Sequence, residues 1–438
     1  MSGSDVRFQV QPGGKIKGAI RVPGDKSISH RSIMLGSLAE GTTQVTGFLE
    51  GEDNLATLDA FRSLGVNIHG PENGKVVIAG VGMHGLKSPG KDIYLGNSGT
   101  SMRLLTGLFS AQAFDCVLTG DKSLSGRPMR RVTDPLARMG AEIETTEKGT
   151  PPVHIHGGQK LCGIDYAMPV ASAQVKSSLL LAGLYANGQT CVTEPAPTRD
   201  HTERMLRGFG YPVQTQGNKI CLLGGGKLKA TNIDVPADIS SAAFFMVAAS
   251  IAPDSDLTLQ HVGINPTRTG VINILRQMGA DIGLANEREV GGEPVADIRI
   301  RSAQLKGIRI PEAQVPLAID EFPAIFVAAA CAQGQTVLTG AHELRVKESD
   351  RIAVMADGLV TLGINAKPTE DGIIIEGGQF GSGEINSHGD HRIAMSFAMA
   401  ALRAQGTIHI TDCANVNTSF PGFVMLAQQV GLTIEQSS

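Results

Sequence analysis

The sequence predicts an α/β fold built from six βαβαββ units, which are grouped three by three into two domains with buried helices. Three observations predict this fold. A polar loop, an almost charge-free helix and a strand recur six times, about 73 residues apart. A second, more polar helix ending in Gly follows each of them. Finally, the two ends of the chain carry strand-like segments that each lack a partner.

The first helix of each unit is apolar nearly all round. Examples are SSLLLAGL (177–184), SAAFFMVAAS (241–250) and FPAIFVAAACA (322–332). A helix that is apolar on all faces is buried. We therefore expect three buried helices inside each domain, surrounded by sheets and amphipathic helices. The repeats begin near residues 23, 95, 169, 236, 316 and 388.

The second helix of each unit is followed by a glycine and then by a strand. A glycine just past a helix end suits the left-handed C′ position, which strains other residues. After this strand, units one to five continue into a second strand, which completes a hairpin. The six glycines are Gly65, Gly140, Gly210, Gly279, Gly363 and Gly431.

The ends of the chain indicate how the units are grouped. The sixth unit stops at LTIEQSS (432–438), without the second strand of its hairpin, while Arg7–Val10 and Ala19–Val22 are strand-like and unassigned. An unpaired edge strand promotes aggregation, so we expect the N-terminal strand to complete the last unit.

This grouping predicts two domains, with the active site in the cleft between them. Residues 1–22 and 236–438 form one domain of three units, and residues 23–235 form the other. The chain crosses between them near Val22–Asp25 and near Val235–Asp238.

Composition excludes several classes of protein. The net charge is −4, whereas duplex nucleic-acid binders usually carry a basic excess. With no Trp and few other aromatics, stacking platforms for single strands are not expected. The longest apolar stretch, Ala324–Ala332, is too short to span a bilayer, and the N-terminus lacks the apolar core of a signal peptide. The six Cys include no C-x-x-C pair, so we interpret them as small buried apolar residues in a reducing cytoplasm.

Charge gathers where the buried helices begin. Helix N-termini favour bound anions, so the cations at these N-termini predict a cleft that binds small, multiply anionic molecules. The alternative is that these charged side chains only keep their loops solvated. The stretch Gly80–Gly85 matches G-x-G-x-x-G, but no helix follows it, so a dinucleotide site is not supported. The charged residues of the loops are Lys26, Arg31, Arg103, Lys176, Asp320 and Arg392. Nearby are Arg127, Arg130, Arg131, Arg199, Arg204, Lys347 and Arg351.

Two carboxylates are candidates for acid–base chemistry. Asp320 begins a buried helix, and Glu348 lies where Lys347 and Arg351 would share one helical face. A carboxylate among cations ionises easily, and expulsion of water can raise its pKa. A plain N-cap for Asp320 and a surface ion pair for Glu348 remain open alternatives.

On eight short strings of residues, the chain resembles the 5-enolpyruvylshikimate-3-phosphate synthase family over essentially its whole length. The R-P-M-x-R and S-A-Q-x-K strings are similar to those of the second of the family's two sequence classes. The resemblance implies the enolpyruvyl transferase fold, a two-domain inverted α/β barrel. The matching strings are PGDKSISHR (23–31), GNSGTSMR (96–103), SGRPMRR (125–131), SAQVKS (172–177), TRDHTE (198–203), DEFP (320–323), RVKESDR (345–351) and GDHR (389–392).

The resemblance implies transfer of the enolpyruvyl group of phosphoenolpyruvate to the 5-hydroxyl of shikimate 3-phosphate, in aromatic amino acid biosynthesis. In that reaction Asp320 would accept the hydroxyl proton and Glu348 would protonate the methylene carbon. Shikimate 3-phosphate would be held by Lys26, Ser27, Arg31, Ser172, Ala173, Gln174, Arg199, Asp320 and Lys347. Phosphoenolpyruvate would be held by Lys26, Gly99, Arg127, Gln174, Arg351 and Arg392, with Asn97 and His391 close by.

The resemblance also implies no cofactor and no metal, a cytoplasmic location and inhibition by glyphosate, which competes with phosphoenolpyruvate. We expect a monomer that binds neither nucleic acid nor membrane. One departure is that members of the first class carry a Lys just before T-F-P near the C-terminus, where this chain has Asn417–Pro421 without Lys. One phosphoenolpyruvate contact is thus unfilled or supplied by another residue.

Two other functions are compatible with parts of this pattern. The sister fold, UDP-N-acetylglucosamine enolpyruvyl transferase, places a reactive Cys a few residues before the counterpart of Arg127. Here residues 120–125 contain none, and Cys116 lies in the preceding strand. The second alternative is a repeat scaffold that binds both anions without turnover.

Overall fold

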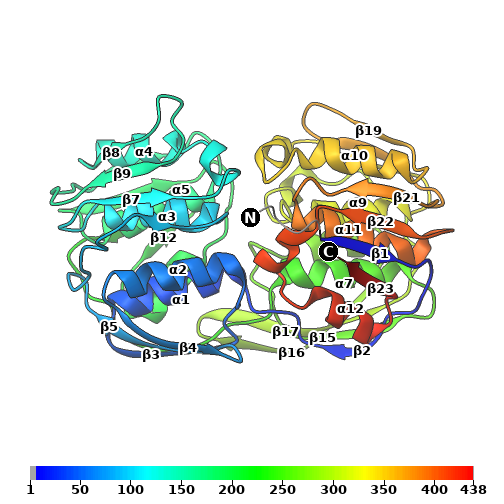
Figure 1. Cartoon of the computed structure of the whole chain (residues 1–438), viewed down its shortest axis with the longest axis horizontal. Helices are drawn as coiled ribbons and strands as arrows, with labels where there is room; N and C mark the ends of the chain where they lie inside the picture. The colour runs from blue at the N-terminus through cyan, green and yellow to red at the C-terminus, as the bar shows by residue number, and fades with distance from the viewer. Residues whose placement is uncertain (1–5, 438) are drawn as a thin grey trace. The chain divides into compact units, whose positions relative to one another are not determined.

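The computed structural model describes residues 6–437, and these form two compact units (Figure 1). Unit 1 contains residues 6–23, 236–289 and 293–437. Unit 2 contains residues 24–235, together with the hairpin tip at residues 290–292. Both ends of the described chain therefore belong to unit 1, and unit 2 is almost entirely one continuous segment.

Unit 2 has three long, mostly buried helices, and a more polar helix follows each of them. Its α5 is buried from Val175 to Gly183, and it packs against α3. The buried helices are α1 (Lys26–Leu38), α3 (Gly99–Phe109) and α5 (Ala173–Gly183). The helices that follow them are α2 (Glu52–Ser63), α4 (Arg130–Arg138) and α6 (His201–Gly208).

Three four-stranded sheets complete the described part of unit 2, and each has one parallel and two antiparallel pairs. The first sheet runs β14 (Asn232–Asp234), β3 (Glu40–Thr46), β5 (Lys75–Val81), β4 (Asn67–Glu72). The second runs β6 (Ile93–Tyr94), β7 (Cys116–Thr119), β9 (Val153–His156), β8 (Glu142–Glu144). The third runs β10 (Asp165–Ala167), β11 (Gln189–Thr193), β13 (Lys219–Leu223), β12 (Gln214–Gln216).

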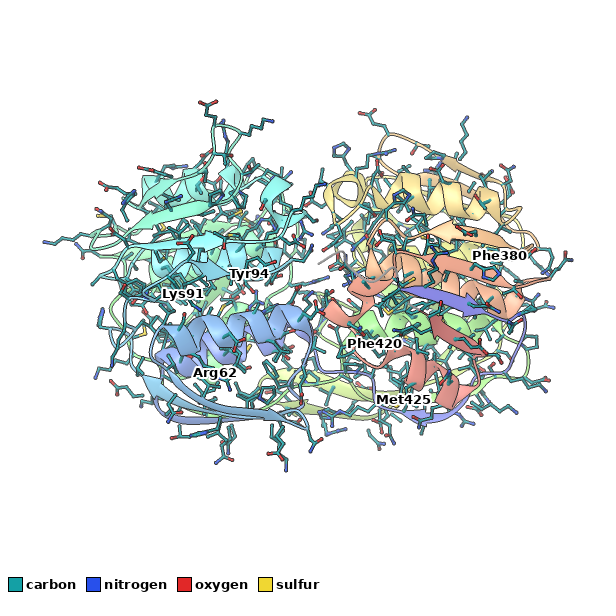
Figure 2. The ribbon with its side chains drawn as sticks, viewed as in Figure 1. Arg62, Lys91, Tyr94, Phe380, Phe420 and Met425 are labelled. Carbon is teal, nitrogen blue, oxygen red and sulfur yellow. A yellow bond between two sulfur atoms is a disulfide. The ribbon has the colours of Figure 1, made fainter. Side chains whose placement is uncertain are left out.

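Unit 1 repeats the arrangement around three buried helices that contact one another. Every residue of α7 and of α9 is buried, as their apolar sequences predict. Phe420, labelled in Figure 2, packs against Phe245 of α7 and Phe423 of α12 in this core. The buried helices are α7 (Ile239–Ile251), α9 (Phe322–Ala330) and α11 (His391–Ala400). The helices that follow are α8 (Gly270–Gln277), α10 (Arg351–Thr361) and α12 (Phe423–Val430).

The sheets of unit 1 include both strands from the start of the chain. One sheet runs β21 (Gly383–Asn386), β22 (Ile408–Thr411), β1 (Arg7–Val10), β23 (Ile434–Ser437). Another runs β16 (Asp281–Val290), β17 (Glu293–Arg301), β15 (Asp256–Gly263), β2 (Lys17–Ile20). The third runs β18 (Gln335–Leu338), β20 (Ile373–Glu376), β19 (Ala366–Pro368), and Arg309 adds a parallel bridge to Val337.

The predicted fold class is confirmed, and so are two of the details that led to it. β1 pairs antiparallel with β23, with Phe8 opposite Gln436 and Val10 opposite Ile434, so the N-terminal strand does complete the last unit. The second N-terminal strand lies two residues earlier than predicted, at Lys17–Ile20, and pairs in parallel with β15. All six glycines that follow the second helices have positive φ, between 76° and 114°.

The expectation for the cysteines is wrong for one pair. Cys191 and Cys221 lie directly opposite each other on β11 and β13 and form a disulfide. They are 30 residues apart in the chain, and only the register of the two strands brings them together. Cys116 and Cys413 are buried free thiols, as expected, whereas Cys162 is exposed.

Candidate active site

Most of the predicted site residues of unit 2 lie at the N-termini of its buried helices. Lys26 and Gly99 are the first residues of α1 and α3. Ser172 is the N-cap of α5, and its hydroxyl accepts a hydrogen bond from the Val175 amide, while Ala173 and Gln174 form the first turn. Helix N-termini present unpaired N–H groups and favour anions. The remaining residues are Ser27 and Arg31 in α1, Arg127 after the 3₁₀ turn η1 (Leu124–Gly126), and Arg199 between β11 and α6.

The N-termini of α3 and α5 are joined by direct hydrogen bonds. Gln174 donates to the Thr100 hydroxyl (3.2 Å) and accepts from Arg103 (2.8 Å). Arg127 donates to Asn97 Oδ1 at 2.6 Å, directly before α3. The structure thus brings together three residues that the sequence assigned to phosphoenolpyruvate: Gly99, Arg127 and Gln174.

Gly99 lies where two guanidinium groups approach the backbone. A Cβ atom at this position would lie 2.9 Å from Arg103 Nη1 and 3.0 Å from Arg127 Nη1. Both arginines would have to move to accommodate even a methyl group. A side chain at this position would therefore change where these two guanidinium groups lie.

The cations of α1 are held by polar partners. Lys26 forms an ion pair with Asp53 of α2. Arg31 is buried, and it donates from Nε to Thr202 Oγ1 (2.7 Å) and from Nη2 to Ser177 Oγ (2.9 Å). A guanidinium held in this way keeps a fixed orientation, which suits recognition of phosphate.

Between these cations lies a buried histidine that sequence reasoning missed. His30 Nδ1 is 2.8 Å from Thr57 Oγ1 and 3.3 Å from Ser101 Oγ. Ser101 is in turn 2.7 Å from Ser98 Oγ, the N-cap of α3. Burial, reinforced by the charges of Lys26 and Arg31, holds the pKa of His30 well below its usual value. A neutral His30 therefore links α1 to the N-terminus of α3.

In unit 1 both candidate carboxylates contact one guanidinium. Arg351, whose side chain is 1% exposed, donates to Glu348 Oε2 (2.6 Å) and to Asp320 Oδ1 (3.3 Å). Lys347 Nζ lies 3.4 Å from the same Asp320 oxygen. The structure therefore brings Asp320, Lys347, Glu348 and Arg351 together.

A third carboxylate, that of Asp390, contacts Arg351 on its buried side. Its side chain is fully buried, and it accepts from Arg351 Nε (2.8 Å) and from the Arg392 amide at the start of α11 (2.9 Å). Burial, the largest single influence, raises the pKa of Asp390, but the charge of Arg351, the hydrogen bond that Arg351 donates and the charge of His391 together outweigh it, so the pKa is lowered. Burial would likewise lower the pKa of Arg351, yet Asp390, Glu348 and Asp320 raise it. This guanidinium is therefore permanently charged.

Arg392 is the remaining predicted residue of unit 1. It donates to the Asp320 backbone oxygen at 2.9 Å, which fixes the turn before α9. Its neighbour His391 is the first residue of α11 and is buried. Residues 417–421, where this chain lacks the Lys of the first sequence class, begin within the last turn of the 3₁₀ helix η5 (Ala414–Thr418) in the same unit.

Two local expectations need correction. Lys347 and Arg351 do not share a helical face, because α10 begins only at Arg351 and Asp350 caps it. Asp320 is not an N-cap, since α9 begins after Glu321 without a side-chain cap. In both cases the side chain is left available for the cluster around Arg351. The sequence strings RVKESDR and GDHR contained the signal for Asp390, but only the fold shows that it pairs with Arg351.

The residues at the N-termini of the buried helices of unit 2 form one cluster, and the residues around Arg351 in unit 1 form a second. Both clusters contain cations that ion pairs with carboxylates or hydrogen bonds hold in place. Among residues 6–437, no three His, Cys, Asp or Glu side chains are grouped as the ligands of a metal would be. Cations of this kind can hold anionic groups, and Asp320 and Glu348 can move protons beside them.

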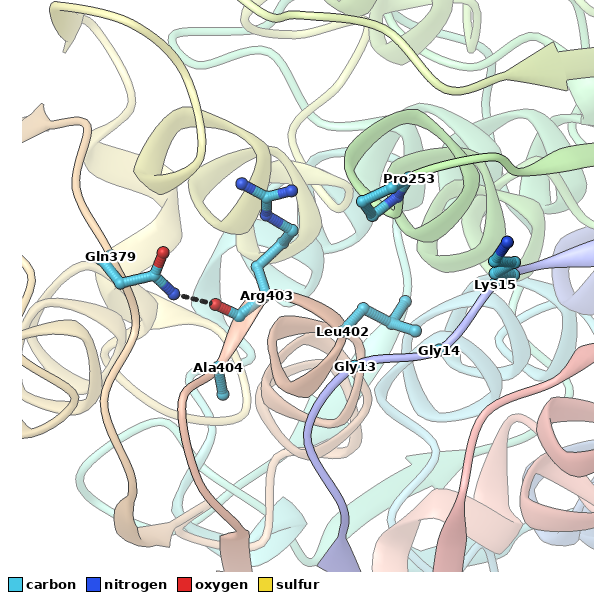
Figure 3. A pocket seen from close by; sticks show the side chains of 8 residues that line it. All are labelled: Gly13, Gly14, Lys15, Pro253, Gln379, Leu402, Arg403 and Ala404. Atoms are coloured by element: carbon cyan, nitrogen blue, oxygen red, sulfur yellow. Dashed lines mark hydrogen bonds between the residues drawn. The ribbon is translucent and has the colours of Figure 1, made fainter.

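A separate hollow of about 490 Å³ in unit 1, lined by Lys15, Gln379 and Arg403 among others, contains none of the predicted site residues (Figure 3). No helix in the described part of the chain is long and apolar enough to cross a membrane.

Comparison with known proteins agrees with this chemistry. The family model for EPSP synthase (3-phosphoshikimate 1-carboxyvinyltransferase) matches residues 10–426. The 3-phosphoshikimate 1-carboxyvinyltransferase of Methylococcus capsulatus is 70% identical, with all of both chains covered. That of Nitrosococcus oceani is 69% identical over 99% of this chain and 98% of its own.

Solved structures give the same result. The EPSP synthase of Acinetobacter baumannii is 66% identical and has a TM-score of 0.91, over 99% of this chain and all of that one. The enolpyruvyl transferase NikO of Streptomyces tendae, at 16% identity and a TM-score of 0.80 over 99% of both chains, shares the fold. A match over nearly the whole chain, at this identity and with these motifs, makes the chain a member of the EPSP synthase (3-phosphoshikimate 1-carboxyvinyltransferase) family.

Proposed function

We propose that the two clusters together perform the reaction of this family. The chain is a transferase: it moves the enolpyruvyl group of phosphoenolpyruvate to the 5-hydroxyl of shikimate 3-phosphate and releases phosphate, in aromatic amino acid biosynthesis. The observation that carries the proposed mechanism is the contact of Asp320 and Glu348 with one buried guanidinium, that of Arg351. Two carboxylates so placed can take up and deliver protons beside a bound anion.

Shikimate 3-phosphate is held, in this proposal, mainly by unit 2. Arg31 is oriented by Thr202 and Ser177, and Ser172 stands at the start of α5, so both suit a phosphate or a ring hydroxyl. Asp320 and Lys347 of unit 1 complete the set near the 5-hydroxyl. The full set is Lys26, Ser27, Arg31, Ser172, Ala173, Gln174, Arg199, Asp320 and Lys347.

Phosphoenolpyruvate carries a carboxylate and a phosphate, and the proposal gives it cations from both units. Arg127 and Gln174 converge on the N-terminus of α3, while Arg351 is the first residue of α10 and Arg392 the second residue of α11. These side chains replace the water that the charges lose on binding. The full set is Lys26, Gly99, Arg127, Gln174, Arg351 and Arg392.

The proposed chemistry has two halves. Asp320 accepts the 5-hydroxyl proton as the oxygen bonds to C2 of phosphoenolpyruvate, and Glu348 protonates the methylene carbon, which gives a tetrahedral intermediate. In the second half Glu348 takes a proton back from the new methyl group. The C2–O bond to phosphate breaks, and the proton held by Asp320 leaves with the phosphate. No net proton or electron is consumed.

Phosphate release decides between this function and its alternatives. Wild-type protein should release phosphate from shikimate 3-phosphate plus phosphoenolpyruvate, and not from a UDP-sugar plus phosphoenolpyruvate. Release with the UDP-sugar would favour the sister enzyme. Binding of both anions without phosphate release would favour a scaffold.

The structure gives a specific argument against the sister enzyme. Its reaction places a reactive thiol near the counterpart of Arg127, and Cys116 of β7 is the nearest preceding Cys in this chain. Burial, together with the charge of Asp115, raises the pKa of Cys116 to about 12, so at neutral pH it is a protonated thiol and a poor nucleophile.

We also propose that the chain acts as a cytoplasmic monomer. Both substrates are multiply charged and do not cross membranes unaided, and every residue assigned above comes from one chain. Cell fractionation tests the location. Light scattering on the purified protein tests the monomer, because a mass near twice the 45.9 kDa of the chain would overturn it.

A further inference from the structure

A buried lysine in unit 2 has no part in the chemistry proposed above. Lys176 lies in α5, two residues after Gln174, and its side chain is 1% exposed. Its Nζ atom is 3.0 Å from Glu194 Oε1 and 2.7 Å from Glu203 Oε1. Both carboxylates are buried as well, with side chains 8% and 3% exposed.

The two carboxylates mark the two sides of the segment that carries Arg199. Glu194 directly follows β11, and Glu203 lies in the first turn of α6. The Thr198 hydroxyl also donates to Glu194 Oε1, which ties the middle of the segment to the same group. One ammonium group therefore fixes both ends of the connection from β11 to α6 against α5.

The neighbours of these residues in the chain hold Arg31. Ser177 follows Lys176, and Thr202 precedes Glu203. The Thr202 hydroxyl donates to Ser177 Oγ at 2.8 Å, and both hydroxyls accept hydrogen bonds from the Arg31 guanidinium. A change in the spacing of α5 and α6 would therefore move the partners of Arg31 and the segment of Arg199 together.

The composition of this cluster is not what core stability alone requires. Ion pairs buried this deeply lose hydration, and apolar side chains of the same volume often stabilise a core as well or better. Glu203 Oε2 is buried without a hydrogen-bond partner among the described residues. Two carboxylates therefore share one ammonium group beside the Arg31 site.

We propose that Lys176, Glu194 and Glu203 form a positioning cluster that sets the orientation of Arg31 and Arg199, and thereby the affinity for the phosphorylated acceptor substrate. The inference rests on the proposed function, since it assumes that these two arginines bind shikimate 3-phosphate. Its three residues do not touch the reacting atoms and act through the arginines alone.

Lys176→Met tests the proposal, because it removes the charge and keeps much of the length. The KM and calorimetric Kd for shikimate 3-phosphate should rise about tenfold or more, as small misplacements of binding groups can cost up to about a hundredfold. The kcat, and the KM for phosphoenolpyruvate at saturating acceptor, should stay within about threefold of wild type. Unchanged acceptor affinity in the folded variant overturns the proposal.

Two further variants separate positioning from stability. Tyr211→Phe removes a hydroxyl of unit 2 that donates to the Leu223 carbonyl and accepts from the Gly226 amide, and it leaves the cluster intact. It should lower the melting temperature without raising the acceptor KM. In Lys176→Met/Glu203→Gln one charge of each sign is gone, so stability should partly recover while acceptor affinity stays low. Recovery of affinity in step with stability would show a merely structural role.

If Lys176→Met fails to fold, the single variants Glu194→Gln and Glu203→Gln test the proposal instead, because each keeps the shape of the side chain and removes its charge. Each should raise the acceptor KM about threefold, since one charge-assisted bond is weakened. An unchanged acceptor KM in both overturns the proposal. The phosphate-release assay on wild type separates failure of the proposed function from failure of this inference. Absence of phosphate release by wild type contradicts the proposed function. Normal wild-type turnover with unaffected variants contradicts this inference only.

Discussion

At the residue scale, the organisation of unit 1 depends on Arg351. One buried guanidinium contacts three carboxylates, and two of these, Asp320 and Glu348, are the proposed proton carriers. Asp390 fixes the arginine from the buried side. The arrangement keeps two acids near one another while the charge between them limits their repulsion.

We predict that Asp320→Asn and Glu348→Gln lose turnover far more than substrate affinity. Several cations remain to bind the substrates, and general acid–base help is typically worth about 10²–10⁴-fold in rate. Steady-state kinetics with both substrates measures kcat and KM separately. Glu312→Gln, which removes a carboxylate of unit 1 that accepts a hydrogen bond from the Thr339 hydroxyl, serves as the control and should stay active. Retention of more than about a third of wild-type kcat by both site variants would contradict the assignment.

We predict that Gly99→Ala raises the inhibition constant of glyphosate more than the KM of phosphoenolpyruvate. The new methyl group would lie about 3 Å from Arg103 and Arg127, so both guanidinium groups must shift and the space beside α3 shrinks. One added methyl in a packed site typically costs about 1–3 kcal/mol, or about 5–150-fold in affinity, and the longer anion should suffer more. Equal fold-changes in the two constants would show that Gly99 does not discriminate between them.

The buried His30 predicts how stability depends on pH. Its pKa is lowered in the folded protein, so the unfolded chain binds the proton more tightly. The stability from a neutral His30 is therefore complete above about pH 6.5 and falls as the pH drops from 6.5 towards the folded pKa. Between pH 7.5 and 5.5 wild type should lose about 1 kcal/mol more than His30→Asn in urea unfolding. Parallel losses in the two proteins would contradict this.

At the scale of elements, the repeat pattern was enough to predict most of the fold. Apolar stretches predicted α7 and α9, and glycines with positive φ end the second helices as expected. What the sequence could not give was pairing between elements. The disulfide between β11 and β13, and the contact of Asp390 with Arg351, join residues 30 and 39 positions apart. Their spacing follows no periodicity, because tertiary register alone decides it.

The same limit applies to the candidate site. The motif strings predicted every residue of the cluster around Arg351 except Asp390. They also placed Lys347 on one helical face with Arg351, although α10 begins only at Arg351. His30 was missed because its role arises from Thr57 and Ser101, which belong to other helices. A buried polar group becomes recognisable only when its partners are known.

The disulfide predicts a thiol count. Denatured protein, prepared without reductant, should titrate four thiols, and reduction should raise this to the six cysteines of the sequence. Cys191→Ser/Cys221→Ser should be less stable than the oxidised wild type by about 3.5 kcal/mol, as expected for a closed loop of this length. Cys162→Ser, which changes an exposed free thiol, is the matched control. Six thiols before reduction would contradict the pairing.

At the scale of the whole molecule, the charges of each unit are more balanced than the sequence indicated. Lys26 is paired with Asp53, and Arg351 is surrounded by carboxylates, so much of the positive charge is compensated within each unit. The proposed substrate sets, in contrast, draw residues from both units. Arg31 and Asp320 are assigned to the same acceptor molecule, although they belong to different units.

We therefore predict that saturating shikimate 3-phosphate lowers the radius of gyration in small-angle scattering. A ligand that binds one arrangement more tightly shifts the population towards it. Arg31→Ala, which weakens the proposed phosphate contact, should need more ligand for the same change. A radius unchanged by saturating ligand would contradict the sharing of one acceptor by the two units.

The pairing of β1 with β22 and β23 has a consequence for the order in which the chain folds during synthesis. Residues 24–235 of unit 2 can leave the ribosome and fold early, whereas β1 must wait for strands that emerge last. At about 5–20 residues per second this delay is on the order of half a minute or more. During that time the first strand needs protection from wrong pairing. Its short length of 4 residues, and the exposed Arg7 and Gln9 that alternate with its buried side chains, limit such pairing before the partners arrive.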